Sequence, residues 1–180
     1  MLDRVIRAAR LDASLYEEVE ADPSSMGQAM TVVVLASIAG GIGTAGIEGQ
    51  PGLVLGLILN LVGWYIWAFL TYFIGTRLLP QPSTEADIGQ LLRTLGFAAA
   101  PGLLRVVGFV PVIGPVVIII TAFWSLATMV VAVRQALDYD STPRAILVCV
   151  IGWIVQLLII MIPFFVLGSF SPSVDSAPAA

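Results

Sequence analysis

The 180-residue chain contains no histidine, no lysine and a single cysteine, Cys149. Without histidine it lacks the commonest metal ligand and general base of proteins. Cys149 stands alone inside an apolar run, so an intramolecular disulfide is excluded and a buried apolar role is expected.

Charge is also scarce, and its distribution indicates membrane spans. Charged residues make up 11% of the chain and apolar residues 58%. No charge occurs in four long stretches, which lie between Asp22 and Glu48, Glu48 and Arg77, Arg105 and Arg134, and Arg144 and Asp175. Each exceeds the ~20 residues that a helix needs to cross the hydrocarbon core. We therefore predict an all-α fold, a polytopic bundle of membrane helices.

The apolar stretches lack the side chains of intramembrane chemistry. No histidine, aspartate, glutamate or lysine falls within a predicted span. Hydrolysis would need a nucleophile with a base, paired aspartates or a metal, and proton relays use titratable side chains. We therefore expect neither an enzyme nor a cofactor, and proton-coupled transport is disfavoured. The net charge of -4, with no basic face, argues against nucleic acid as a partner.

All eight basic residues are arginines, and they mark every other connection. Arg4, Arg7 and Arg10 precede the first apolar run, Arg77 and Arg93 bracket the polar segment after the second, and Arg134 and Arg144 bracket the segment between the last two. Basic residues gather in cytoplasmic loops of membrane proteins. The pattern predicts a cytoplasmic N-terminus and a C-terminus outside.

Five transmembrane helices are expected, at about 27–47, 52–76, 93–110, 115–133 and 145–168. They would form a membrane domain of residues 26–168, between a cytoplasmic amphipathic segment (1–25) and a disordered outer tail (169–180). The first span is rich in small residues, which favours a central position. The third is the shortest, and Pro101 and Gly102 interrupt it. As an alternative, residues 93–111 form a re-entrant loop, which leaves four spans and places the C-terminus inside. Arg134 and Arg144 would then face outward.

The N-terminal segment predicts two short surface helices. Leu2, Val5, Ile6 and Ala9 recur at helical spacing, with the arginines largely on the other side, as in helices that lie at the headgroup level. A second helix, starting at Ser14, would carry an apolar stripe that includes Leu15 and Tyr16. The segment either docks on the bundle or recognises a partner. The candidate partner surface comprises Leu15, Tyr16, Arg93, Arg134 and Arg144.

Three polar residues within the spans are candidate membrane sites. Arg105 falls in the outer half of the third span, where its side chain can reach lipid phosphates. It is either structural, a contact for a lipid headgroup or anion, or part of a subunit interface. Asn60 and Gln156 are mid-membrane amides that join helices or contact a ligand.

Three local patterns together resemble the Yip family, the Ypt/Rab-interacting five-span membrane proteins, and in particular its bacterial branch. The first is a Gly-aromatic-xxx-Pro signature formed by Gly96, Phe97 and Pro101. The second is Pro111-Val112-Ile113-Gly114 followed by Trp124. The third is Arg134-Gln135-Ala136-Leu137-Asp138, with Arg144 entering the last span.

The resemblance implies an architecture and a class of role. Eukaryotic members are associated with Rab GTPases, Golgi and endoplasmic-reticulum traffic and membrane shaping, and they carry an Asp-Leu-Tyr-Gly-Pro-like motif. Here Ser14-Leu15-Tyr16-Glu17-Glu18 keeps only Leu-Tyr. The resemblance therefore implies a scaffold, adaptor or accessory subunit in the plasma (inner) membrane of a bacterium. Its expected partners are membrane lipids, a protein partner or larger membrane complex, and further copies of itself. The alternative is a lipid-handling or small-solute pathway that uses Arg105, Asn60 and Gln156.

Overall fold

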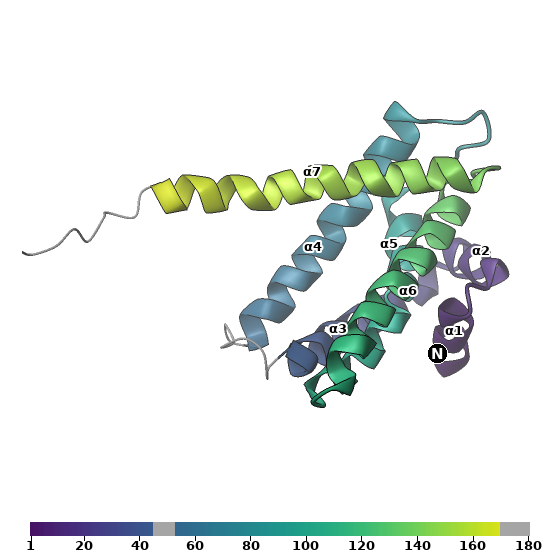
Figure 1. Ribbon diagram of the computed structural model, residues 1–180. Helices are drawn as coiled ribbons and strands as arrows, with labels where there is room; N and C mark the ends of the chain where they lie inside the picture. Colours follow the sequence, from purple (N-terminus) through teal and green to yellow (C-terminus); the bar gives the residue numbers. More distant parts are fainter. Residues whose placement is uncertain (45–52, 170–180) are drawn as a thin grey trace, which may run out of the picture.

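Every regular element that the structure describes is helical. The computed structural model describes residues 1–44 and 53–169, and Figure 1 shows their arrangement. The elements are α1 (Leu2–Ala9), α2 (Ala13–Ala21), η1 (Pro23–Ser25), α3 (Met26–Thr44), α4 (Leu53–Phe73), the π-helical η2 (Ile74–Leu78), α5 (Ile88–Ala98), the 3₁₀-helical η3 (Ala100–Phe109), α6 (Ile113–Ala136) and α7 (Thr142–Ser169). The predicted all-α class is confirmed.

Several of these helices are long and apolar enough to cross a membrane. Within the described residues they are Pro23–Gly43, Ile88–Phe109, Ile113–Ala136 and Thr142–Ile159. α4 has 21 residues, and its sequence contains no charged residue. The polytopic membrane class is confirmed. The predicted end of the first span (45–47), the first residue of the second (52) and most of the predicted tail (170–180) lie outside the described residues.

The helix that carries the third predicted span begins at Ile88, five residues before the start of that span. Asp87 is the N-cap of α5 and accepts from the Gln90 amide at 2.9 Å, while the Gln90 side chain accepts from the Asp87 amide at 2.6 Å. This reciprocal capping box satisfies two backbone donors at the start of the helix. At Ala100 the α-helix gives way to η3, where Pro101 has no N–H to continue the α-helical ladder.

The α5–η3 segment is the centre of the bundle. Buried residues make up 67% of its most apolar window, against 28% for Pro23–Gly43. The expectation that the first span is central is therefore wrong. α3 runs parallel to α5–η3 at very short range. A Cβ added at Gly96 would lie 2.7 Å from the Ala29 Cβ, and one added at Gly108 would lie 3.0 Å from the Gly43 carbonyl oxygen.

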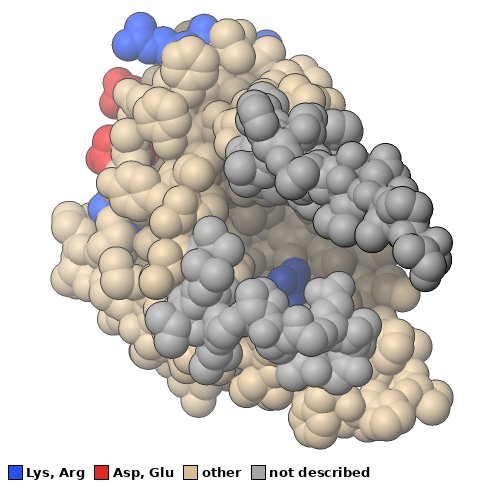
Figure 2. All heavy atoms as spheres, turned by 90° about the vertical axis from the view of Figure 1, so that its left-hand side faces the viewer, with Lys and Arg blue, Asp and Glu red and all other residues tan. Residues whose placement is uncertain are grey.

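The core lies at the inner end of the bundle, which we define as the end with α2, the α4–α5 connection and the α6–α7 connection. Its largest fully buried side chains are Tyr16, Phe97, Leu15, Ile74, Leu91, Leu95 and Leu137. Away from this end α4 and α7 diverge, and α7 projects to one side (Figure 1). On that side the surface has a hollow, and basic side-chain atoms, drawn in blue, lie on its floor (Figure 2).

Candidate functional site

Arg93 joins α2 to the centre of the bundle. Its side chain is buried, and it donates to the Val19 carbonyl at 2.9 Å and to the Glu20 carbonyl. Both carbonyls belong to the last turn of α2, where they have no donor within the helix. A cation at this position also interacts favourably with the helix dipole. Arg93 therefore caps α2 and fixes it on α5.

The N-terminal residues expected on a partner surface are in the core. Leu15 and Tyr16 are both 0% exposed, and the Tyr16 hydroxyl donates to the Ala8 carbonyl at 3.2 Å. Burial raises the pKa of Tyr16 above its ordinary value. The apolar stripe of α2 packs inward, so neither residue is available to a partner in this arrangement. Together with Arg93, they hold the N-terminal helices in place.

The α6–α7 connection is attached to the end of α4. The Tyr139 hydroxyl lies 2.7 Å from the Leu79 carbonyl oxygen and 3.1 Å from that of Gly75. Gly75 permits this packing, since a Cβ there would lie 2.4 Å from Leu137 Cδ1. Arg144 donates to the Pro80 carbonyl at 3.4 Å. The two inner connections therefore form one unit.

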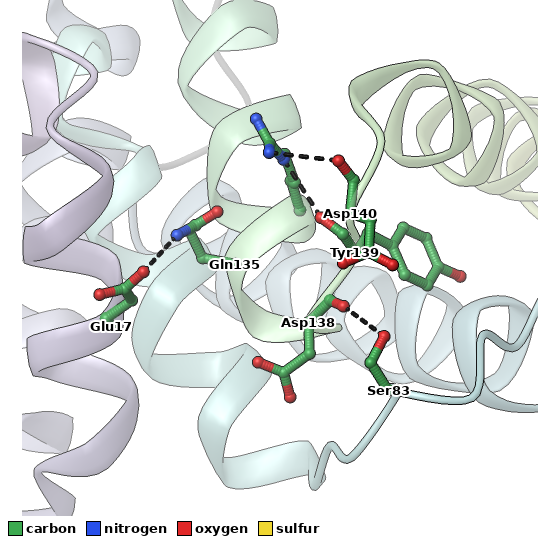
Figure 3. Close-up of a pocket in the computed structure, with 7 residues that line it drawn as sticks. Glu17, Ser83, Gln135, Asp138, Tyr139 and Asp140 are labelled. Atoms are coloured by element: carbon green, nitrogen blue, oxygen red, sulfur yellow. Dashed lines mark hydrogen bonds between the residues drawn. The ribbon is translucent and has the colours of Figure 1, made fainter.

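Three segments of the inner end meet around an open polar pocket of 420 Å³ (Figure 3). Gln135 donates to Glu17 of α2 at 2.7 Å, and Ser83 donates to the Asp138 carbonyl at 2.9 Å. Arg134 donates to the carbonyls of Tyr139 and Asp140, at 3.2 and 3.3 Å. The lining residues are Glu17, Ser83, Arg134, Gln135, Asp138, Tyr139 and Asp140. Segments 2–20, 83–93 and 134–144 thus contribute to one surface.

This surface is acidic, because its arginines turn to backbone carbonyls while its carboxylates remain exposed. We call it the acidic inner face; it comprises Glu17, Glu20, Glu85, Asp87, Asp138 and Asp140, all exposed except the half-buried Glu20. Burial, together with the nearby Asp138, raises the pKa of Glu20 to about 7 against the opposing effect of Arg93. Burial also raises the pKa of Asp138. Arg134, which lines the pocket, and Arg144 are half-buried, and their expected part in a partner surface stays a prediction.

The candidate residues within the spans occupy separate places. Arg105 is half-buried, and its Cδ lies 3.9 Å from a Cβ added at Gly40, so its side chain runs along α3. Asn60 is on the exposed side of α4. Gln156 of α7 meets α4 at Gly63, one helical turn from Asn60, and its Oε1 is buried without a hydrogen-bond partner among the described residues. The structure thus brings Gln156 against α4 at Gly63, and the roles of Asn60, Gln156 and Arg105 stay predictions.

The residues of the Yip-like sequence patterns pack helices closely together or lie where one helix ends and the next begins. Phe97 is fully buried, Pro101 opens η3, and Pro111 lies at the exposed turn before α6. A Cβ at Gly114 would lie 2.0 Å from the Gly108 carbonyl oxygen, which only glycine permits. Trp124 Nε1 donates to the Ala9 carbonyl at 2.7 Å. That last contact was missed, because nothing in the spacing of the sequence pairs α1 with the middle of α6.

The helical fold and its long apolar helices define a multi-pass, all-helical membrane protein. In the described part of the chain, no three histidine, cysteine, aspartate or glutamate side chains are grouped to hold a metal ion. Comparison with protein-family models matches residues 13–163 to the Yip1 domain, and the chain belongs to this family. No match was found among the curated proteins or among the solved structures.

Proposed function

We propose that this chain is a non-enzymatic membrane scaffold, adaptor or accessory subunit whose acidic inner face binds a basic segment of a protein partner. The observation that carries the proposal is the convergence of three separate segments on one surface with its carboxylates exposed. Arg93 and Arg134, which could neutralise them, instead bind backbone carbonyls. Such a surface attracts a basic partner and disfavours an acidic one.

The partner is tested by pull-down of the tagged full chain from its native membrane in mild detergent. Wild type is expected to recover one stoichiometric partner. The double variant Glu85→Gln/Asp140→Asn is expected to lose it, and raised salt should weaken it, because interactions between exposed charges are screened. The control Asp3→Asn removes an exposed carboxylate outside this face and should retain the partner. Equal recovery in both variants, or a pure homo-oligomer with bound lipid, would contradict the proposal.

We also propose five crossings, with the N-terminus inside and the C-terminus outside, in the plasma membrane of a bacterium. α4 contains no charged residue. The α5–η3 segment runs parallel to α3 from Gly96 beside Ala29 to Gly108 beside Gly43, so it reaches as far as α3 does. Both features support five crossings over a re-entrant third segment. The arginines of both inner connections support the orientation. In a Cys149→Ala background, a membrane-impermeant maleimide should label Val112→Cys in cells whose inner membrane is intact. Glu85→Cys should be labelled only after that membrane is permeabilised; the reverse would overturn the orientation.

A further inference from the structure

α1 lies beside the membrane-spanning part of the bundle and does not extend beyond its inner end. The hydrogen bond from Trp124 to the Ala9 carbonyl fixes its position. Trp124 is nine residues before Val133, where the predicted fourth span ends. At 1.5 Å per residue this is about 14 Å along the helix, within the inner half of a hydrocarbon core of about 30 Å. α1 also packs against α5 and η3, and Figure 1 shows it alongside α6.

The charges on the inward side of α1 are paired with acidic residues from α2 and its flanks. Arg4 lies 2.8 Å from Glu18 and 3.2 Å from Asp22. Arg7 lies 2.8 Å from Asp12 and 2.7 Å from Glu18. Pairing lowers the cost of bringing charges toward a region of low dielectric constant. The α1–α2 hairpin therefore neutralises these two arginines within itself.

The outward side of α1 carries large apolar side chains, and the exposed charged residues Asp3 and Arg10 lie near the two ends of the helix. Leu2 and Ile6, one helical turn apart, are 73% and 43% exposed, whereas Ala8 between them and α2 is fully buried. Leu11, in the turn that follows, is also exposed and has a positive φ of 64°, an uncommon conformation for a residue with a branched side chain. α1 thus presents large apolar side chains next to the membrane-spanning helices, while its paired arginines face α2.

We propose that α1 is embedded in the inner leaflet, with Leu2, Ile6 and Leu11 in contact with lipid acyl chains. The depth along α6, the pairing of Arg4 and Arg7 and the exposed apolar side chains each fit a helix that contacts acyl chains, with Asp3 and Arg10 at its ends free to reach toward the headgroups. A protein occupant fits less well, because an eight-residue helix offers far less than the ~800 Å² per partner of a stable interface.

The test is spin labelling of the full chain in liposomes, in a Cys149→Ala background. Labels go at Leu2→Cys and Ile6→Cys, with Phe123→Cys on the exposed side of α6 as the lipid reference and Glu17→Cys on the acidic inner face as the water reference. All four positions are exposed, so the substitutions leave the core intact. Collision with oxygen, which enters lipid, is compared with collision with a water-soluble nickel chelate.

We expect the oxygen-to-nickel collision ratio at Leu2→Cys and Ile6→Cys to match that at Phe123→Cys and to exceed that at Glu17→Cys several-fold. A ratio equal to that of Glu17→Cys would place α1 in water and overturn the proposal. Low access to both reagents with spin–spin broadening between labels would indicate a second copy of the chain, which also overturns it. Neither result depends on the partner of the acidic inner face.

Discussion

Gly43 of α3 and Gly108 of η3 meet backbone to backbone, so that a Cβ at Gly108 would lie 3.0 Å from the Gly43 carbonyl oxygen. The opposite substitution is worse, since a Cβ at Gly43 would lie 2.0 Å from the Arg105 carbonyl oxygen. Both obstacles are backbone atoms, which cannot move aside as a flexible side chain can. Small residues allow this approach of helices in lipid, where tight packing replaces the hydrophobic effect.

Gly43→Ala should therefore destabilise the bundle by about 1–3 kcal/mol, the usual cost of overpacking. Gly27→Ala on the same helix is the matched control, because nothing lies within 4 Å of a Cβ there. The control should be neutral or slightly stabilising, since alanine is the better helix former. Thermal unfolding in detergent measures both. Equal midpoints for the two variants would contradict the close approach of α3 and η3.

Arg93→Ala should release α2 from the bundle. The substitution leaves the Glu20 carbonyl without its Arg93 donor and the Val19 carbonyl with only the Ser25 hydroxyl, and a buried group that loses its partner costs about 1–3 kcal/mol. Hydrogen exchange of the α2 amides should accelerate, with α6 little changed. Arg77→Ala, at an exposed position of η2, is the control. Unchanged exchange in α2 after loss of Arg93 would show that the cap does not hold the helix.

Leu15→Ala should destabilise the protein by about 2–5 kcal/mol through a cavity in the core. Tyr16→Phe keeps the ring and loses only the hydrogen bond to Ala8, so its effect should be nearer 1 kcal/mol. Unfolding in detergent should rank the two in this order. If both variants instead unfold like wild type but recover less partner than wild type, these side chains belong to a binding surface.

Stability should fall as the pH rises from 5 to 8 because of Glu20. Its pKa is about 7 in the folded protein and ordinarily 4.5, so folding favours the protonated form. This contribution is complete below pH 4.5 and is lost as the pH passes 7. Because Glu20 is only half-buried, we expect about 1 kcal/mol. The carboxylates of Asp12, Glu18 and Asp22 have lowered pKa values and act only at more acidic pH.

Glu20→Gln should flatten this dependence and raise the unfolding midpoint at pH 8. The groups that act on Glu20 are Asp138, Arg93, Glu17 and Asp87, and all remain in the variant. Glu85→Gln, an exposed carboxylate of the same face, serves as the control and should keep the wild-type slope. A slope that persists in Glu20→Gln assigns the effect to another group.

Charge and hydropathy were sufficient to predict the helical membrane class. Uncharged stretches locate α6 and α7, and Pro101 correctly indicated the interruption of the third segment. The sequence does not show which side of a membrane helix is buried, because lipid-facing and core-facing residues are both apolar. For that reason α3, with its many glycines, was expected at the centre that α5–η3 occupies.

The acidic inner face was beyond sequence reasoning for a different reason. Arg93 and Arg134 bind backbone carbonyls, and no pattern of side chains shows where those carbonyls lie. Leu15 and Tyr16 were recognised as an apolar stripe, but a stripe on a short helix can pack inward or face a partner. Only the position of α2 against α5 decides between the two.

The 3₁₀ conformation of η3 affects how well the length of the third apolar segment matches the thickness of the hydrocarbon core. The apolar part of the third segment after Arg93, residues 94–110, would be about 25 Å long as a continuous α-helix, short of a core of about 30 Å. A 3₁₀-helix rises about 2.0 Å per residue, so the ten residues of η3 add about 5 Å. In the five-crossing topology proposed above, the shortest of the predicted spans would thus match the bilayer by stretching its backbone, without thinning the lipid around it.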